Sequence, residues 1–282
     1  DHLDHDWLMK FVGHRVADSR MLHLIAKWLK VGVMEAGQWS ETEVGTPQGG
    51  VISPLLANIY LHYVLDLWVE QWRKKNARGE VYIVRYADDF VMGFQYKSDA
   101  QRMLSDLGVR LGKFGLELHS DKTRLIEFGR FAADNRAKRG EGKPETFNFL
   151  GFTHICARRR KDGRFTVWRK SMGKRMQRKL SEIGETLKRN LHEPIVEQGK
   201  HLRSVLLGWY LYHGVPMNGR ALSRMRWEIG RLWFTALRRR SQKARRLTWT
   251  TMGKIMVAWL PMPHIYHPWP NKRFSQRLAL SS

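Results

Sequence analysis

Helical spacing of apolar residues is the main pattern in the first part of the chain. Apolar positions that recur every three to four residues predict helices beginning at Asp6, at Asp18 or Ser19, at Ser53 and at Ser98. Asp6, Ser53 and Ser98 are expected as N-caps, because their side-chain oxygens can accept hydrogen bonds from the unpaired N–H groups of a first turn. The long helix from Ser53 is expected to bury Leu55, Leu56, Ile59, Tyr63, Leu67 and Trp68.

Two β-rich runs, residues 81–86 and 90–94, flank the sequence Ala87-Asp88-Asp89. This arrangement predicts a β-hairpin with two carboxylates at its tip, because aspartate is common in tight turns. Adjacent carboxylates repel each other, so a rigid turn that carries both favours the binding of divalent cations. A pair of Mg²⁺ ions is the usual device for nucleotidyl transfer. The alternative is a solvated hairpin tip without a chemical role.

Further strands are expected after this hairpin. Short strands are predicted at residues 116–119 and 124–128. A second hairpin is predicted from residues 147–152 and 164–168, with its turn around Asp162-Gly163. Together with the carboxylate hairpin they indicate an α+β fold over residues 1–168, in which helices back an antiparallel sheet.

The pattern changes to helices alone in the last part of the chain. Helices are expected from about Ser171, Pro194, Gly219 and Thr248, each with an apolar stripe at helical spacing. Residues 169–282 are therefore expected to form an all-α bundle.

Two other segments are expected as connections. Residues 33–44 predict a loose hairpin that leads into the glycine-rich segment 45–50, where the backbone can approach a nucleotide or a template closely. Residues 132–145 are charged and contain glycine, which predicts a surface loop.

Composition narrows the class of partner. The formal net charge of +24 and the pI near 10.5 predict a polyanionic partner. Aromatic residues interleaved with arginine favour nucleic acid over an acidic membrane, because bases stack on rings and guanidinium planes. The sequence contains no run of about 18 apolar residues, so no membrane span is predicted. The single cysteine, Cys156, permits no intrachain disulfide and favours a cytoplasmic location.

Basic runs near residue 160 and in the last third indicate where a polyanion would bind. Such runs are often only solvated faces, but here few acidic residues interrupt them, which favours phosphate binding. The residues expected to bind nucleic-acid phosphates are Arg158, Arg159, Arg160, Lys174, Arg175, Arg238, Arg239, Arg240, Arg245 and Arg246.

The chain resembles the reverse transcriptases of group II introns, also called maturases. Residues 86–89, Tyr-Ala-Asp-Asp, are similar to the Tyr-x-Asp-Asp box of reverse transcriptases. Residues 45–58, Gly-Thr-Pro-Gln-Gly-Gly-Val-Ile-Ser-Pro-Leu-Leu-Ala-Asn, resemble the corresponding motif of the group II enzymes. Residues 121–124, 147–152 and 208–214 are similar to later motifs of the same family, so the resemblance covers nearly the whole chain.

The resemblance implies an RNA-directed DNA polymerase with a right-hand architecture. Residues 1–168 would form the palm with a remnant of the fingers, and residues 169–282 the helical thumb, or maturase domain. Asp88 and Asp89 would hold two Mg²⁺ ions, with Asp88 the more direct ligand. The implied substrates are deoxynucleoside triphosphates and a DNA primer, and the implied template and partner is intron RNA.

The resemblance also assigns roles to three other groups of residues. Pro47, Gln48 and Gly49 would contact the nucleotide or the template. Lys122 would lie near the nucleotide phosphates, unless it is an ordinary turn lysine. The primer grip would be Phe149, Leu150 and Gly151, a segment that can also serve as a core strand.

Two other functions stay open. The chain can be a splicing cofactor that binds RNA without catalysis, or a reverse transcriptase of another lineage, such as a retron or CRISPR-associated enzyme. The intact residues 86–89 favour a polymerase, and the maturase-like bundle favours the intron lineage. In the family, a further metal-binding aspartate precedes the point where this chain begins. The resemblance therefore predicts an N-terminally incomplete enzyme that binds RNA but does not extend a primer alone.

Overall fold

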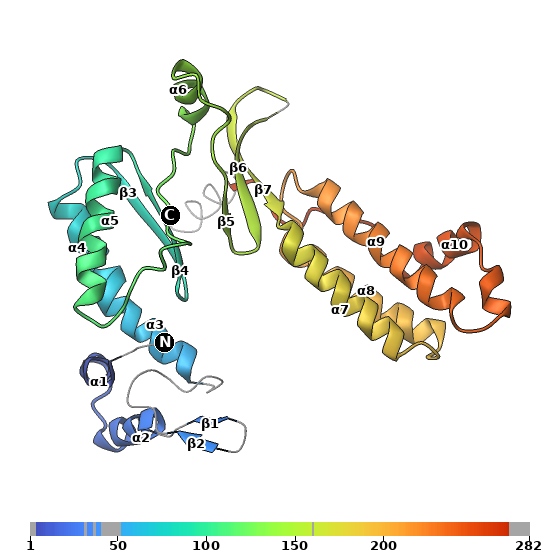
Figure 1. Ribbon diagram of the computed structural model, residues 1–282, viewed down its shortest axis with the longest axis horizontal. Coiled ribbons are helices and arrows are strands. Elements are labelled where there is room, and N and C mark those ends of the chain that lie inside the picture. The colour runs from blue at the N-terminus through green and yellow to red at the C-terminus, as the bar shows by residue number, and fades with distance from the viewer. Residues whose placement is uncertain (1–3, 31–32, 36–37, 41–51, 160, 271–282) are drawn as a thin grey trace, which may run out of the picture. The chain divides into compact units, whose positions relative to one another are not determined.

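The computed structural model (Figure 1) describes residues 4–30, 33–35, 38–40, 52–159 and 161–270, and only the backbone of residues 30, 33–35 and 38–40. The chain forms two compact units, the N-terminal unit Asp1–Ile126 and the C-terminal unit Glu127–Ser282. Each unit has a hydrophobic core of its own. The predicted α+β fold class is confirmed, whereas the domain division between residues 168 and 169 stays a prediction.

The N-terminal unit combines helices with two small hairpins. Its elements are α1 (His5–Gly13), α2 (Ser19–Lys30), β1 (Val33–Glu35), β2 (Gln38–Ser40), α3 (Ser53–Leu61), the π-helical turn η1 (His62–Asp66), α4 (Leu67–Lys75), β3 (Val81–Tyr86), β4 (Asp89–Phe94) and α5 (Lys97–Gly112). β1 pairs antiparallel with β2, as expected for residues 33–44, and β3 pairs antiparallel with β4 to form the predicted hairpin.

The helices begin close to the predicted positions, but three of the N-caps differ. Asp4, not Asp6, caps α1, because its Oδ1 accepts from the N–H groups two and three residues on, at 2.9 and 3.0 Å. Asp18 caps α2 in the same way. Ser53 is the first residue of α3 and Ser98 is the second residue of α5. Neither helix has a side-chain cap.

The predicted stripe of the long helix is partly wrong, because η1 interrupts the regular spacing. Val64 of η1 and Val69 of α4 are five residues apart and are both buried, whereas the predicted Leu67 is 42% exposed. The predicted Leu55, which lies before η1, is 59% exposed as well. A π-turn adds one residue to a turn and so shifts the phase of every following position. Arg110 of α5 donates to the carbonyl of Val64 at 3.0 Å and to that of Tyr63 at 3.3 Å, within this turn.

Residues 116–119 and 124–128 are not strands, contrary to the prediction. Leu116 and Leu118 pack against the N-terminal core, so their alternation reflects burial and not pairing in a sheet. The segment then turns at His119, whose carbonyl accepts from the N–H groups of Lys122 and Thr123 at 3.1 and 2.9 Å. In the described part of the N-terminal unit, β3 and β4 therefore form a sheet of their own.

The C-terminal unit consists of a small sheet and a helical bundle. Its elements are α6 (Ala132–Lys138), β5 (Phe147–Phe149), β6 (Phe152–Arg158), β7 (Phe165–Ser171), α7 (Gly173–Arg189), α8 (Ile195–His213), α9 (Gly219–Arg238), the 3₁₀ turn η2 (Lys243–Arg246) and α10 (Trp249–Trp259). The strands form an antiparallel sheet in the order β5-β6-β7. Residues 132–145, predicted as a loop, contain the short helix α6.

The segment at residues 147–152 is a tight hairpin and not the single strand that was predicted. Phe149 pairs with Phe152, so Leu150 and Gly151 are the two residues of the turn. Their φ angles, 47° and 77°, are both positive, as a type I′ turn requires. The predicted turn at residues 162–163 is confirmed, and Gly163 has a φ of 65°.

The helices of the bundle occupy the predicted segments. α7 and α8 pack against α9, and α10 contacts α8 and α9 (Figure 1). Their core contains Leu202, Leu206, Met225 and Trp233, all with no exposed surface. Trp233 donates its indole N–H to Gln198 at 2.8 Å, which satisfies the polar atom of the largest buried side chain.

A buried polar cluster joins the sheet to this bundle. Ser171 Oγ lies 3.1 Å from His213 Nδ1 and accepts from Asn218 Nδ2 at 2.8 Å. Burial and, secondarily, Arg175 lower the pKa of His213 to about 4. The imidazole is therefore neutral at pH 7 and can share a hydrogen bond with Ser171.

Across the part of the chain that the structure describes, no helix is long and apolar enough to cross a membrane.

Candidate functional site

The tip of the β3–β4 hairpin carries both predicted carboxylates. Tyr86 pairs with Asp89, so Ala87 and Asp88 form the connecting turn. Ala87 has a φ of 53°, a left-handed conformation that costs energy for a residue with a side chain and persists only where surrounding contacts hold it. Asp88 and Asp89 are both exposed at this turn.

The two faces of the hairpin differ in character. Val81 and Ile83, with Met92 opposite, lie on the face that packs against the N-terminal core. The other face presents Tyr86, which is 66% exposed, with Asp89 as its cross-strand partner. Because side chains alternate along a strand, Asp89 belongs to the open face. A nucleic acid or a metal ion can therefore reach this carboxylate without displacing the core.

Arg85 fixes the tip from the covered face. Its guanidinium forms a bidentate pair with Asp66 of η1, at 2.8 Å from Nε to Oδ1 and 2.6 Å from Nη2 to Oδ2. Nη1 also donates to Asn58 Oδ1 of α3 and to the Ala87 carbonyl, both at 2.8 Å. One side chain thus connects the strained turn to two helical segments. We call Asn58, Asp66, Arg85 and the Ala87 carbonyl the Arg85 cluster.

The electrostatics of the tip leave the two carboxylates available to a cation. The hydrogen bonds that Arg85 donates to Asp66 raise the pKa of Arg85, against the lowering effect of burial. Asp66 compensates this cation, so Arg85 does not occupy Asp88 or Asp89. Within the described residues, the carboxylates of Asp88 and Asp89 make no hydrogen bond or ion pair. Unpaired carboxylate oxygens are the ligands that Mg²⁺ prefers, so the tip fits such an ion.

Within the described residues, Asp88 and Asp89 have no third carboxylate, His or Cys beside them to complete a metal site. Among the residues described, no group of three or more His, Cys, Asp or Glu side chains is arranged to hold a metal ion. Lys122, predicted near the nucleotide phosphates, is exposed in the turn that follows His119. Pro47, Gln48 and Gly49 lie outside the described residues.

The predicted primer-grip residues form the β5–β6 turn. The Leu150 carbonyl accepts from the Tyr212 hydroxyl of α8 at 2.9 Å, and the Gly151 carbonyl accepts from Met172 N at 3.0 Å. A Cβ on Gly151 would lie 3.1 Å from Nη1 of Arg175. The turn is therefore held by residues at the start of α7 and at the end of α8. Whether Phe149, Leu150 and Gly151 contact a primer stays a prediction.

The predicted RNA-binding residues have different surroundings. Lys174 and Arg175 are exposed at the start of α7, and Arg239, Arg245 and Arg246 are exposed around η2. Arg238 is exposed but lies over the Phe234 ring and donates to the Arg245 carbonyl at 3.2 Å. Arg240 is half-buried and donates to the Glu193 carbonyl, and burial lowers its pKa. Arg240 is thus a structural residue more than a surface contact.

Arg158 and Arg159 lie at the end of β6, whereas Arg160 lies outside the described residues. The contacts of Arg158 and Arg159 are described below, because both line a hollow of the C-terminal unit.

The prediction from the sequence missed the Arg85 cluster. A signal was present: Arg85 follows Val81 and Ile83 at alternate positions of β3, on the face expected to be buried. A charged residue at a core-facing position requires a partner, since an isolated charge is too costly to bury. The identity of that partner, Asp66, depends on the phase shift that η1 introduces.

Comparisons with known proteins identify the family to which the chain belongs. The family model described as reverse transcriptase (RNA-dependent DNA polymerase) matches residues 1–154, more than half of the 282 residues. The group II intron-encoded protein LtrA of Lactococcus lactis subsp. cremoris is 48% identical over 27% of this chain and 12% of its own length. Protein YkfC of Escherichia coli (strain K12) is 35% identical over 44% of this chain and 40% of its own length.

A more distant relative is an uncharacterized 91 kDa protein in the cob intron of Schizosaccharomyces pombe, 26% identical over 48% of this chain and 17% of its own length. The chain thus spans less than half of each of these relatives. The names of LtrA and of the Schizosaccharomyces pombe protein refer to introns, in agreement with the intron lineage expected from residues 45–58. By the match over residues 1–154, the chain belongs to the reverse transcriptase family, with group II intron-encoded proteins among its homologues.

Proposed function

We propose that this protein is the RNA-directed DNA polymerase of a group II intron, which extends a DNA primer with deoxynucleoside triphosphates on an RNA template. The observation that carries the proposal is the hairpin tip, where Asp88 and Asp89 are exposed and unpaired among the described residues. Family membership supports the same chemistry. A solvated tip without a role would not require a buried arginine to hold its turn.

In this proposal Asp88 and Asp89 hold the metal ions, and Asp88 is the more direct ligand. Bound Mg²⁺ would stabilise charge on the attacking and leaving oxygens during nucleotidyl transfer. Arg85 keeps the turn in position, because it bonds to the Ala87 carbonyl from the covered face. Tyr86 presents its exposed ring beside Asp89, where it can contact the nucleic acid or the nucleotide.

Other parts of the chain would position the substrates. Pro47, Gln48 and Gly49 would contact the nucleotide or template, and Lys122 the phosphates. Phe149, Leu150 and Gly151 would grip the primer. The rigid anchoring of the Leu150 and Gly151 carbonyls supports this role, since a grip must hold its position under load. Residues 1–168 would act as the palm and residues 169–282 as the thumb.

A second function, binding of intron RNA to assist splicing, is favoured by the exposed cations of the C-terminal unit. Lys174, Arg175, Arg239, Arg245 and Arg246 are all exposed there. Relatives whose names refer to introns support the intron lineage over a retron or CRISPR-associated enzyme. Binding of this kind does not require Asp88 or Asp89.

Iron-directed cleavage tests the metal site without depending on turnover. Fe²⁺ replaces Mg²⁺, and hydroxyl radicals made at the bound ion cut the nearby backbone, which mass spectrometry locates. We expect cuts around residues 86–90 that are lost in Asp88→Asn and Asp89→Asn, because each change removes a charged ligand. Glu117→Gln is the matched control, since Glu117 is an exposed acid of the same unit. Equal cutting in the parental chain and both variants would overturn the metal assignment.

Primer extension tests the reaction itself. In an assay in which the parental protein extends a primer, either aspartate change should lower the rate by roughly 100-fold or more, because metal ions supply several kcal/mol of transition-state stabilisation. RNA affinity should stay unchanged. Extension at the parental rate by both variants would contradict the catalytic role.

A further inference from the structure

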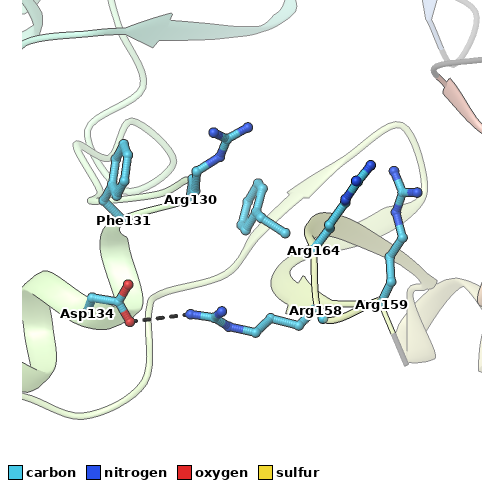
Figure 2. A pocket seen from close by; sticks show the side chains of 8 residues that line it. Arg130, Phe131, Asp134, Arg158, Arg159 and Arg164 are labelled. Atoms are coloured by element: carbon cyan, nitrogen blue, oxygen red, sulfur yellow. Dashed lines mark hydrogen bonds and ion pairs between the residues drawn. The ribbon is translucent and has the colours of Figure 1, made fainter. Parts of the chain in front are cut away.

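A hollow in the C-terminal unit gathers arginine and phenylalanine side chains from two separate segments. It has a volume of about 650 Å³, within the range of ligand-binding clefts. Its lining is Arg130, Phe131, Asp134, Arg158, Arg159, Gly163, Arg164 and Phe165. Figure 2 shows Arg130 and Phe131 on one side of the hollow, and Arg158, Arg159 and Arg164 on the other.

The arginines of this hollow have only loose partners within the described structure. Arg158 lies 3.5 Å from Asp134, and Arg159 and Arg164 lie 3.7 and 3.8 Å from the same carboxylate oxygen of Asp162. The Arg159 guanidinium also lies over the Trp269 ring, 5.4 Å from its centroid. A tight charge-assisted hydrogen bond measures about 2.7–2.9 Å, so these ion pairs leave most guanidinium donors free. A phosphate with its three or four oxygens can use them.

Two arginines of the hollow have polar groups without a partner among the described residues. The Nε of Arg159 is buried, and no described residue accepts a hydrogen bond from it. Arg130 has no ion pair with any residue described. Buried donors are nearly always satisfied, so an unpaired one in a cationic hollow points to a missing acceptor. An anionic group in the hollow would supply this acceptor.

The aromatic residues add a second kind of contact. Phe131 is 65% exposed beside the arginines, although an exposed ring loses the stabilisation that burial would give. Phe165 is half-buried on the other segment. A ring beside planar guanidinium groups is the surface on which an unpaired base stacks. An acidic peptide would use the arginines but would leave Phe131 exposed.

We propose that this hollow binds a nucleotide of single-stranded RNA, with its phosphate on the arginines and its base stacked on Phe131. A duplex fits poorly, because its bases already stack on one another and hide their faces. The proposal deepens the RNA-binding role proposed above. It assigns the contact to Arg130, Phe131 and Arg164, which the basic run at residues 158–160 does not include.

Binding of a fluorescent single-stranded oligouridine by the full 282-residue chain tests the stacking. Phe131→Leu keeps an apolar side chain but removes the ring, so affinity should fall about 5- to 150-fold, the range for losing one stacked base. Phe131→Trp keeps a ring and should retain affinity. With 5-iodouridine in the RNA, irradiation should cross-link the parental chain at Phe131. Equal affinity of Phe131→Leu, together with no cross-link in this segment, would overturn the proposal.

The arginines are tested by salt dependence. Arg130→Gln and Arg164→Gln should each lower the slope of log K against log salt by about 0.7, the value for one phosphate contact on a single strand. Arg231→Gln is the matched control, because it removes the same charge from an exposed position on α9, outside the hollow. Equal slopes in all variants would show that the hollow makes no phosphate contact.

Competitors separate the sources of the ligand. Excess unlabelled oligouridine should displace the probe at far lower concentration than uridine monophosphate, uridine triphosphate or polyglutamate. Displacement by the free nucleotides at equal concentration would assign the hollow to nucleotides, and preferential displacement by polyglutamate would assign it to an acidic protein; either result overturns the proposal. If the parental chain binds no RNA at all, the broader RNA-binding role fails as well. If the parental chain binds RNA, Phe131→Leu binds it equally and no cross-link forms in this segment, only the hollow is excluded.

Discussion

Arg85 shows how one side chain can determine the position of the turn that carries Asp88 and Asp89. It contacts Asn58, Asp66 and the Ala87 carbonyl, and it is 13% exposed. The carboxylates next to Ala87 depend on the left-handed φ of that residue, which is unfavourable without support. We therefore treat Arg85 as a positioning residue and not as a catalytic one.

Replacing Arg85 with glutamine should loosen the tip and destabilise the N-terminal unit by about 1–3 kcal/mol, since Asp66 loses its bidentate partner and keeps only the looser contact with His62, at 3.5 Å. Arg85→Lys should not restore the parental state, because lysine cannot form the bidentate pair. Urea unfolding gives the stability, and iron-directed cleavage at residues 86–90 gives the position of the tip.

Arg73→Gln is the control for Arg85. Arg73 pairs with Glu70 on the surface of α4, so its loss should change stability by less than about 1 kcal/mol. If Arg85→Gln behaved like this control in both measurements, the Arg85 cluster would have no positioning role.

At the scale of elements, close packing of α10 on its neighbours depends on glycine. A Cβ on Gly199 of α8 would lie 2.5 Å from the ring of Trp259, and a Cβ on Gly230 of α9 would collide with Met256. Gly208 of α8 has no atom within 4 Å of its hypothetical Cβ. Of the two glycines of α8, Gly199 thus leaves no room for a side chain, whereas Gly208 does.

Gly199→Ala should destabilise the bundle, because the cost of overpacking, about 1–3 kcal/mol, exceeds the helix-propensity gain of at most about 1 kcal/mol. Gly208→Ala should stabilise it by about 0.5–1 kcal/mol, since only the propensity gain applies. Thermal unfolding followed by circular dichroism measures both. A rise in stability for Gly199→Ala would mean that α10 does not pack on α8 at this distance.

At the scale of the whole molecule, the charge of +24 is the dominant property. Exposed cations of the C-terminal unit include Arg239, Arg245 and Arg246, whereas Arg240 is held by the Glu193 carbonyl. Charge of this density attracts polyanions and makes their binding sensitive to salt.

Replacing Arg239, Arg245 and Arg246 together with glutamine should weaken RNA binding and lower the slope of log K against log salt by about 2–3, because each phosphate contact contributes about 0.7–0.9. Titration with labelled RNA between low and moderate salt measures the slope. The double variant Lys200→Gln with Arg231→Gln is the control, since each of these exposed cations already pairs with a glutamate on the surface. An unchanged slope in the triple variant would assign these arginines to a solvated face.

Much of the fold follows from neighbours in the sequence. The Ala87-Asp88 turn, the turn at residues 162–163 and the helices of the bundle were all predicted, and all depend on contacts within a few residues. Helical spacing and turn chemistry depend on residues a few positions apart, so the sequence alone predicts these elements. The resemblance to reverse transcriptases also rested on contiguous residues, 86–89 and 45–58, and the family match over residues 1–154 confirmed it.

Other features depend on partners that are far apart along the chain. Arg85 and Asp66 are separated by 19 positions, and Tyr212 and Leu150 by 62. The phase of the long helix depended on η1, and the hollow joins the segment before α6 to the β6–β7 turn. These contacts arise because burial and hydrogen bonding select partners in three dimensions, where spacing along the chain no longer identifies them.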